Sequence, residues 1–419
     1  HAGYQLPVSK ITVNLAPASQ KKSGPVFDLP IFLAVMAASG QIGEPPQDAA
    51  FVGELSLSGQ LRPVNGALSM ALKAKEDGVR ALYLPAQNAK EASIVDGLQV
   101  YPVEDIAELC ACLQGEREIA PMPFDPMLLL AGGNHFLEDM ADVRGQPFAK
   151  RALEIAAAGG HNLLLIGPPG TGKSMLAKRL PTILPKLSFQ EAIETTRIYS
   201  VAGLLPPDHP IMNTRPFRAP HHTVSPAGLT GGGSSPMPGE ISLAHNGVLF
   251  LDELPEFQRQ ALEVLRQPIE DNRVTISRAS SRVTYPCSMM FVAAMNPCPC
   301  GYRGHPKIAC TCSQMAVQRY ISRVSGPLLD RIDLHVEVAP VEFADLTGEN
   351  REESSATVRA RVEAARRIQQ RRFAGEEISC NARIPAGRLQ QFCPLEKQAL
   401  DFLRTSFENL GMTARAYDR

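Results

Sequence analysis

The feature that most constrains the fold is a glycine-rich segment that joins an apolar run to a helical pattern. Residues 161–166 (His-Asn-Leu-Leu-Leu-Ile) have the pattern of a buried strand. Residues 167–174 (Gly-Pro-Pro-Gly-Thr-Gly-Lys-Ser) match the phosphate-loop pattern G-x-x-x-x-G-K-[ST], and a helical pattern begins at Ser174. Glycines let the backbone aim successive N–H groups at phosphate oxygens, and the following helix turns its positive end toward the same anion. The segment therefore predicts a binding site for ATP.

Each position of this loop has an expected role in nucleotide binding. Lys173 should reach the β- and γ-phosphates, and the Ser174 hydroxyl should hold Mg²⁺. The expected nucleotide-binding residues are Gly167, Pro168, Pro169, Gly170, Thr171, Gly172, Lys173, Ser174 and, from further along the chain, Asp252.

A second apolar run ends in two carboxylates. Residues 247–253 (Gly-Val-Leu-Phe-Leu-Asp-Glu) predict a short strand followed by Asp252 and Glu253. An apolar strand that ends in two carboxylates is typical of a Walker B segment. Because a phosphate loop lies about 80 residues upstream, we expect the strand before that loop and this strand to belong to one parallel sheet. Asp252 is then expected in the Mg²⁺ shell, and Glu253 is expected to deprotonate the attacking water. The alternative is a strand followed by an aspartate that caps a helix.

Two more polar residues follow apolar segments. Residues 288–295 predict a buried strand that ends at Asn296, whose amide is expected to position the water or contact the γ-phosphate. Asn296 also precedes Pro297, so a turn-forming role is the alternative. Residues 328–334 (Leu-Leu-Asp-Arg-Ile-Asp-Leu) place Arg331 where ring-forming ATPases carry an arginine finger for a neighbouring site. The alternative is a surface arginine paired with a neighbouring aspartate.

Four of the nine cysteines form two C-x-C pairs that are separated by nine residues. An odd cysteine count spread over 419 residues argues against a disulfide framework and favours the cytoplasm. In a reducing compartment the pairs predict one structural Zn²⁺, although C-x₂-C is the usual spacing and Cys110-Ala-Cys112 gives the same pattern inside a predicted helix. His305 is a spare ligand, and Arg303 in the same loop is a candidate DNA contact. The expected ligands are Cys298, Cys300, Cys310 and Cys312.

Residues 1–115 predict a first α+β domain, which a linker over 116–135 connects to the rest of the chain. Its expected elements are a strand over 11–15, a helix over 27–40, a hairpin over 53–62, a helix over 67–78, a strand over 80–85 and a helix over 103–113. Because the chain begins with His1 and not with Met, this domain is expected to be incomplete at its N-terminal side.

Three segments of this domain resemble the proteolytic domain of Lon-type proteases: residues 22–25, 53–66 and 81–85. The family's nucleophilic serine follows Gly-Pro, where this chain has Val26, and its lysine follows the glycine pair, where this chain has Ala67-Leu-Ser-Met. A Ser–Lys dyad needs a hydroxyl and an amine within hydrogen-bond reach. The domain is therefore expected to be a retained scaffold without peptidase activity.

Two insertions interrupt the predicted ATPase core over 136–345. Residues 200–240 form a long glycine-rich segment, in which His221 and His222 are interpreted as polar loop residues. Residues 273–285 predict a hairpin with Arg278 and Arg282 at its tip. These insertions resemble those of the helix-2-insert branch of the AAA+ ATPases, which includes magnesium chelatase. In such rings both insertions face the pore, so the tip arginines are expected to bind DNA phosphates, against the alternative of plain solvation.

Residues 346–419 predict a helical lid, incomplete at its C-terminal end, in which Arg415 resembles the second sensor arginine of AAA+ proteins. The order of these parts and the four-cysteine segment together are similar to the ComM/YifB family. The resemblance implies a hexameric ATPase that drives branch migration on single-stranded and branched DNA during natural transformation. The alternative is a magnesium-chelatase-like motor that remodels a protein.

The bulk composition neither adds to nor opposes this interpretation. The formal net charge is −1, so any DNA contact must come from a local patch, and no run of 18 apolar residues predicts a membrane span. The expected fold class is α/β: a degenerate Lon-like α+β domain, a parallel-sheet phosphate-loop core and a helical lid.

Overall fold

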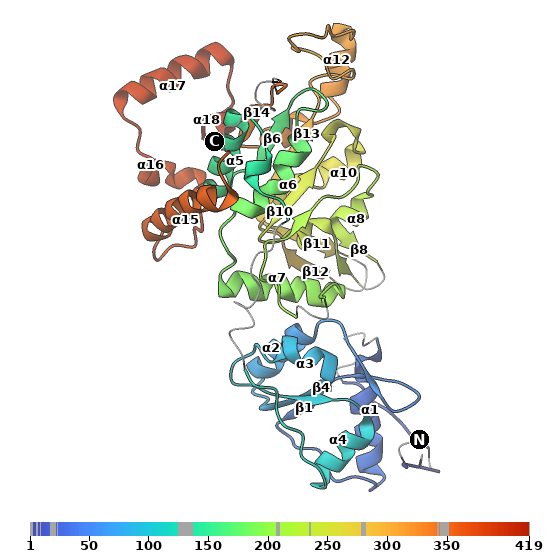
Figure 1. Ribbon diagram of the computed structural model, residues 1–419. Coiled ribbons are helices and arrows are strands. Elements are labelled where there is room, and N and C mark those ends of the chain that lie inside the picture. The colour runs from blue at the N-terminus through green and yellow to red at the C-terminus, as the bar shows by residue number, and fades with distance from the viewer. Residues whose placement is uncertain are drawn as a thin grey trace. The chain divides into compact units, whose positions relative to one another are not determined.

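The computed structural model describes residues 3–5, 7–8, 10–16, 22, 24–124, 137–206, 210–233, 236–277, 282–341, 343 and 352–418. They form two compact units, drawn in Figure 1. Unit 1 comprises His1–Gly133 and Phe189–Asn213, and unit 2 comprises Asn134–Ser188 and Thr214–Arg419. Across the part of the chain described here, no helix has the length and apolar character needed to cross a membrane.

Unit 1 is built on a parallel sheet of order β1-β4-β5 with helices on both faces. Side chains alternate between the two faces of a strand, and β4 follows this rule: Leu82 and Leu84 pack against α2 and α3, whereas Tyr83 packs on the side of α1 and α4. Its elements are η1 (Pro25–Phe27), α1 (Asp28–Ala38), β1 (Ala49–Phe51), β2 (Glu54–Leu55), β3 (Leu61–Arg62), α2 (Ala67–Glu76), β4 (Ala81–Pro85), α3 (Ala86–Ala92), β5 (Gln99–Val103), α4 (Ile106–Leu113) and α7 (Phe189–Ala202).

Most predicted elements of unit 1 are confirmed, including the hairpin, in which β2 and β3 pair antiparallel. The predicted strand over 11–15 is wrong. Residues 10–15 are described as irregular chain, and Ile11, Val13 and Leu15 are exposed. Their alternation resembles a strand, but no described backbone pairs with them, and a strand needs a partner for its N–H and C=O groups.

Unit 1 is larger than the predicted domain in two places. Within the predicted linker, Ile119 is buried and the Met122 amide donates to the Val100 carbonyl oxygen at 2.7 Å. Helix α7, predicted as part of the ATPase core, packs against α2, and the Gly66 amide donates to the Ser200 carbonyl oxygen at 3.0 Å. The predicted domain range of 136–345 places these residues in the ATPase core, and the structure places them in unit 1.

Unit 2 is an α/β unit whose five-stranded sheet has the order β14-β6-β13-β10-β7, with every neighbouring pair parallel. Its three central strands, β6, β13 and β10, are buried on both faces, as expected for a parallel sheet covered by helices. In β13, Phe291 and Ala293 join the core on one face, and Val292 and Ala294 join the core on the other. The sheet strands are β6 (Leu163–Ile166), β7 (Phe217–Arg218), β10 (Val248–Leu251), β13 (Met290–Met295) and β14 (Leu334–Glu337).

The other elements of unit 2 surround this sheet. They are η3 (Met140–Asp142), α5 (Pro147–Gly159), α6 (Lys173–Ile183), α8 (Pro226–Thr230), β8 (Gly231–Gly232), β9 (Met237–Pro238), α9 (Glu240–Leu243), η4 (Leu254–Glu256), α10 (Arg259–Glu263), α11 (Arg266–Asp271), β11 (Arg273–Ser277), β12 (Arg282–Pro286), α12 (Gln314–Ile321), α13 (Gly326–Leu329), α15 (Ser355–Arg372), η5 (Asn381–Arg383), η6 (Ala386–Arg388), α16 (Leu389–Phe392), α17 (Lys397–Leu410) and α18 (Ala414–Asp418).

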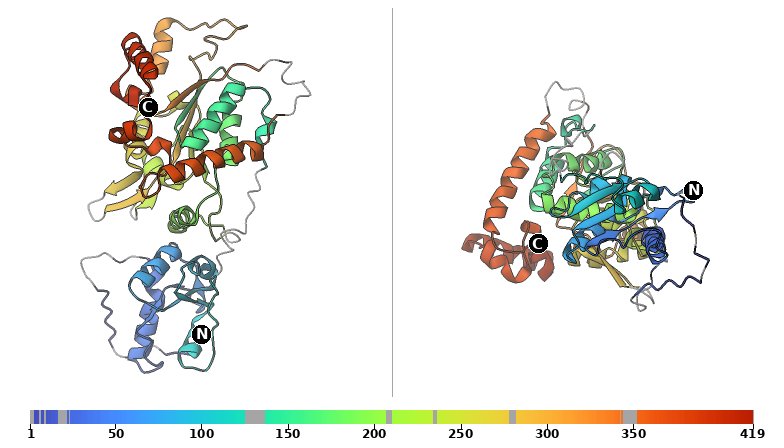
Figure 2. Two further views of the ribbon diagram at one scale, coloured as in Figure 1. Left: turned by 90° about the vertical axis from the view of Figure 1, so that its left-hand side faces the viewer. Right: turned by 90° about the horizontal axis from the view of Figure 1, so that it is seen from below.

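The first helix of the predicted lid is α15, which packs along α5 and α6 (Figure 2). Val358 and Val362 join the same core as the sheet. The Arg361 guanidinium donates to both carboxylate oxygens of Glu154, at 2.7 and 3.2 Å, and this contact lowers the pKa of Glu154. The start of the lid is therefore fixed to the helix that precedes the phosphate loop.

The predicted hairpin is confirmed for its described residues. Strands β11 and β12 pair antiparallel, with Val274 opposite Tyr285 and Ile276 opposite Val283. In β11, Val274 and Ile276 are buried and the three residues between and beside them are exposed. One face of the hairpin therefore belongs to the core and the other is open.

Candidate nucleotide site and four-cysteine cluster

The phosphate loop lies between β6 and α6, at the carboxyl end of the sheet. Gly170 and Gly172 have φ angles of 78° and 87°, in the left-handed region that glycine adopts without strain. A Cβ atom on Gly167 would lie 2.3 Å from the Val338 carbonyl oxygen. The glycines are thus required both by the tight turn and by the close approach of the chain segment that follows β14.

Lys173 is buried at the start of α6 and faces back into the loop. Its ammonium group donates to the carbonyl oxygens of Gly167 at 2.7 Å and Pro168 at 2.8 Å, and to Asn296 Oδ1 at 3.2 Å. Burial lowers the pKa of Lys173, while the charges of Asp252 and Glu253 act in the opposite direction. The lysine therefore joins the loop to the end of β13, which is the strand next to β6.

The loop, Asp252 and Asn296 line one cavity of about 370 Å³. Ser174 Oγ donates to Asp252 Oδ2 at 2.5 Å, so the predicted Mg²⁺ ligands lie side by side. A hydroxyl and a carboxylate are the oxygen ligands that Mg²⁺ takes in phosphate-loop sites. The cavity is lined by Pro169, Gly170, Thr171, Gly172, Lys173, Ser174, Met175, Asp252, Glu253, Met295 and Asn296.

Glu253 follows directly after Asp252 and has an unusual backbone conformation. Its φ angle of 51° is left-handed, which is uncommon for a residue other than glycine, and its amide donates to Asp252 Oδ1 at 2.9 Å. The side chain is largely exposed, and its Oε2 lies 3.7 Å from His222 Nδ1. The carboxylate is therefore at the open side of the cavity, where a water molecule can reach it.

Sequence reasoning missed His222, which it interprets as a polar loop residue. The His222 ring lies against His221 at a tilt of 36°, and its Nδ1 lies beside the Glu253 carboxylate. No local pattern indicates this contact, because His222 and Glu253 are far apart in the chain. Gln146, at the N-terminus of α5, also reaches the phosphate loop: it donates to the Thr171 carbonyl oxygen at 3.3 Å and to the Ala339 carbonyl oxygen at 2.5 Å.

Arg331 lies in a buried network of unit 2 and only 8% of it is exposed. Its guanidinium donates to Glu270 Oε2 at 2.8 Å, to the Arg266 carbonyl oxygen at 3.1 Å and to the Pro327 carbonyl oxygen. The alternative of a surface arginine is wrong, because the residue is buried. In this arrangement the guanidinium is bound within its own chain, so a role in a neighbouring site would require it to leave these partners.

The predicted DNA-binding arginines do not gather on one surface. Arg282 starts β12, which precedes β13, whereas Arg303 lies in the loop that follows β13; both side chains are exposed. Because one arginine precedes β13 and the other follows it, Arg282 lies toward the amino ends of the parallel strands and Arg303 toward their carboxyl ends. Arg278 and the side chain of Arg415 lie outside the described part of the chain.

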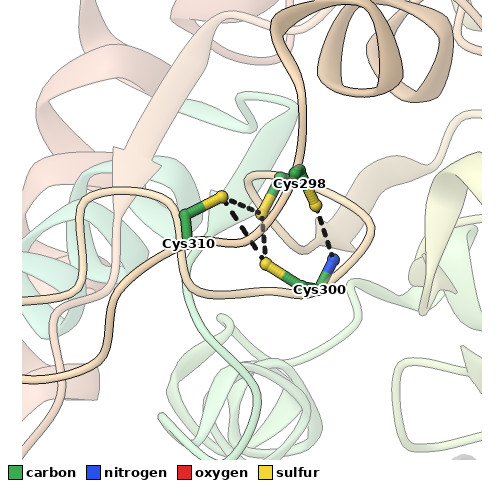
Figure 3. A group of neighbouring side chains, drawn as sticks. Cys298, Cys300 and Cys310 are labelled. Atoms are coloured by element: carbon green, nitrogen blue, oxygen red, sulfur yellow. Dashed lines mark hydrogen bonds between the residues drawn. The ribbon is translucent and has the colours of Figure 1, made fainter.

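The four predicted metal ligands converge. The ligand atoms of Cys298, Cys300, Cys310 and Cys312 all lie within 4.8 Å of one another. Figure 3 shows three of the sulfurs pointing toward one another; Sγ of Cys298 is 3.4 Å from that of Cys300 and 3.7 Å from that of Cys310. Backbone hydrogen bonds from Tyr302 and Thr311 lower the pKa of Cys300 to about 6.

These distances fit a tetrahedral zinc site. With Zn–S bonds of about 2.3 Å, the sulfurs at the corners of a tetrahedron would lie about 3.8 Å apart. The three separations among Cys298, Cys300 and Cys310, 3.4 to 3.7 Å, are close to that value and far longer than a disulfide bond of about 2.0 Å, and the Cys312 sulfur lies within 4.8 Å of each of them. His305 instead accepts hydrogen bonds from the backbone of Lys307 and Ile308 through Nδ1.

Three family models match the chain. The model described as "Magnesium chelatase, subunit ChlI" matches residues 139–346. "Subunit ChlI of Mg-chelatase" matches residues 1–88, and "Magnesium chelatase, subunit ChlI C-terminal" matches residues 352–419. Together they cover most of both units.

Full-length relatives give the same assignment. The chain is 44% identical to the protein YifB of Escherichia coli, over all of this chain and 81% of the relative. It is also 44% identical to the competence protein ComM of Haemophilus influenzae, with the same coverage of both chains. A human mitochondrial Lon protease homologue is 34% identical over 26% of this chain and 12% of its own length.

Proposed function

Because this chain belongs to the ComM/YifB family of magnesium-chelatase-like AAA+ proteins, we propose that it is an ATP-driven motor that acts on single-stranded and branched DNA. The proposal of ATP hydrolysis is supported above all by one observation: Lys173, Asp252 and Asn296 line the same cavity. The H. influenzae relative is named a competence protein, which supports a role in taking up or integrating DNA.

Each residue around the cavity has a defined part in ATP hydrolysis. The loop amides and Lys173 bind the phosphates, and Asn296 holds the lysine toward them. Ser174 and Asp252 hold Mg²⁺, which neutralises phosphate charge when bound. Glu253 takes the proton of the attacking water, and His222 orients the Glu253 carboxylate.

A neighbouring subunit completes this site in our proposal. We assign the trans-acting arginine to Arg331, which would exchange its contact with Glu270 for the transferred phosphoryl group when subunits form a ring. A hexameric ring is expected from the family resemblance. Arg415, which lies in α18, is proposed to contact the nucleotide of its own subunit.

DNA is proposed to contact the hairpin β11–β12 through Arg282 and Arg278. The open face of the hairpin and its exposed arginine support a contact with phosphates, which requires positive charge but no base recognition. Since the net charge of the chain is −1, a local contact of this kind is needed. Arg303 is a separate candidate toward the carboxyl ends of the strands.

The four cysteines are proposed to bind one structural Zn²⁺. The support is the sulfur geometry and the chemistry of four thiolates, which prefer zinc in a reducing compartment. Bound zinc would draw the two C-x-C pairs together and order the loop between them.

The direct test of this proposal is the rate of ATP hydrolysis with and without single-stranded DNA. We expect DNA to stimulate the rate, and we expect Lys173→Ala to hydrolyse no ATP with or without DNA. Hydrolysis that needs Lys173 but responds to no DNA would favour a motor that remodels a protein. Hydrolysis that does not need Lys173 would refute the nucleotide site.

A further inference from the structure

We infer that the four-cysteine loop positions the phosphate loop and Asn296, so that loading the cluster with zinc raises the affinity for ATP. This inference rests on the proposed zinc and ATP sites and adds a coupling between them. It assigns Gly301 as a positioning residue that acts through Pro169.

The first end of the loop is the end of β13. Asn296 accepts a hydrogen bond from Lys173, and Cys298, which is fully buried, follows two residues later. Two residues allow little independent movement, because each adds at most about 3.6 Å of chain. A ligand bond that fixes the Cys298 sulfur therefore also restricts the Asn296 side chain.

The middle of the loop touches the phosphate loop directly. Gly301 is buried, has a φ angle of 85° and closes a turn through a hydrogen bond from its amide to the Cys298 carbonyl oxygen. A Cβ atom at Gly301 would lie 2.6 Å from Pro169 Cδ and 3.2 Å from Pro169 Cγ. No methyl group fits there unless the backbone of one loop moves. Pro169 also lines the nucleotide cavity.

The second end of the loop returns to Asn296. Cys312 is followed by Ser313, whose hydroxyl accepts a hydrogen bond from the Ala316 amide and caps α12. Tyr320 on this helix is buried in the core, and its hydroxyl lies close to the Asn296 backbone amide. Both ends of the cysteine loop thus brace the residue that holds Lys173.

The loop needs the metal to keep this shape. The described residues between Cys300 and Cys310 form turns and bends and no helix or strand. The four sulfurs lie within 4.8 Å of one another, and a bound cation would tie them together. Without zinc we expect the sulfurs to separate. The loop would then no longer hold Gly301 against Pro169 or restrict the Asn296 side chain.

The chain offers a matched pair of variants for the test. Gly301 and Gly304 both have left-handed φ angles, 85° and 79°, so alanine strains the backbone similarly at either position. A Cβ atom at Gly304 would meet nothing within 4 Å, whereas one at Gly301 would meet Pro169. A difference between Gly301→Ala and Gly304→Ala therefore reports the contact with the phosphate loop and not the strain.

The experiment measures zinc per chain and the dissociation constant of a fluorescent ATP analogue, with Mg²⁺ present, for the full chain and both variants. We expect Gly301→Ala to keep its zinc and bind the analogue between about tenfold and a hundredfold more weakly, because small misplacements in such sites have effects of this size. Gly304→Ala should match the wild type in both measurements. Wild-type protein stripped of zinc, then freed of chelator, should lose affinity similarly and regain it when zinc is returned.

Three results decide the inference. Unchanged affinity in zinc-free wild type would overturn it, even if Gly301→Ala bound weakly. Unchanged affinity in a zinc-loaded Gly301→Ala protein would overturn the contact with Pro169. Wild-type protein that holds no zinc, or binds no nucleotide, would refute the proposed sites themselves and this coupling with them.

Discussion

Lys173 and Asn296 are hydrogen-bonded across adjacent strands, with the lysine ammonium 3.2 Å from the amide oxygen although 123 residues separate them. The contact exists because β6 and β13 are neighbours in a parallel sheet, and polar residues after parallel strands meet at one edge. The contact places the uncharged amide oxygen of Asn296 beside the ammonium group that we propose binds the β- and γ-phosphates of ATP.

Glu253→Gln should bind ATP normally and lose turnover by at least about a hundredfold, since general-base catalysis usually contributes that much. Glutamine preserves the size of the side chain but cannot accept the proton of the attacking water. Nucleotide binding and single-turnover hydrolysis, measured on the same sample, separate the two steps. Turnover near the wild-type rate would remove Glu253 from the role of base.

Arg331→Ala should abolish turnover, because it removes the proposed trans-acting arginine. It should also lower the melting temperature, because it removes a partly buried ion pair with Glu270 at 2.8 Å. The melting temperature alone cannot separate a structural role from a trans role. Mixing Arg331→Ala with Lys173→Ala can, since a mixed ring contains some sites with both residues intact. Recovered hydrolysis in the mixture is the expected result; two inactive variants that stay inactive together would contradict a trans role.

Purified protein should contain about one zinc per chain, the number that four thiolates bind in a structural site. The double variant Cys298→Ser with Cys310→Ser should contain none, as measured by atomic emission. Cys112→Ser is the control, because Cys110 and Cys112 have the same C-x-C spacing but lie in or beside the core of unit 1 on α4. Wild-type protein without zinc would refute the metal site.

Arg282→Ala should weaken binding to single-stranded DNA and reduce the slope of log affinity against log salt by about 0.7, the value for one phosphate contact. Arg282→Lys keeps the charge and should keep the slope. Affinity measured at four or more salt concentrations gives this slope. An unchanged slope in the alanine variant would show that Arg282 is only solvated.

Local sequence patterns predicted the elements that carry the site. The phosphate loop, the strand before Asp252 and the hairpin at Arg282 are each defined by residues close together in the chain, so periodicity and glycine placement were sufficient. The convergence of the cysteine pairs was also predictable, because glycine and proline permit the turns between them.

Contacts between distant segments that match no known motif were not predictable. Nothing near His222 indicates that it faces Glu253, and nothing near Gly301 indicates that it packs on Pro169. The sequence places α7 in the ATPase core because of its position in the chain, and the tertiary structure assigns it to unit 1. The predicted strand over residues 11–15 is wrong for the same reason. A strand forms only when another segment pairs with it, and the alternating pattern of the segment itself does not show whether such a partner exists.

The measurement that tests the central proposal most directly is ATP-dependent release of a labelled strand from a three-stranded branched DNA. We predict release with ATP and Mg²⁺ by the wild-type protein and none by Lys173→Ala, which lacks the ammonium group expected to bind the β- and γ-phosphates. Release that is equal with and without ATP, or equal in the two proteins, would contradict a DNA motor driven by this site.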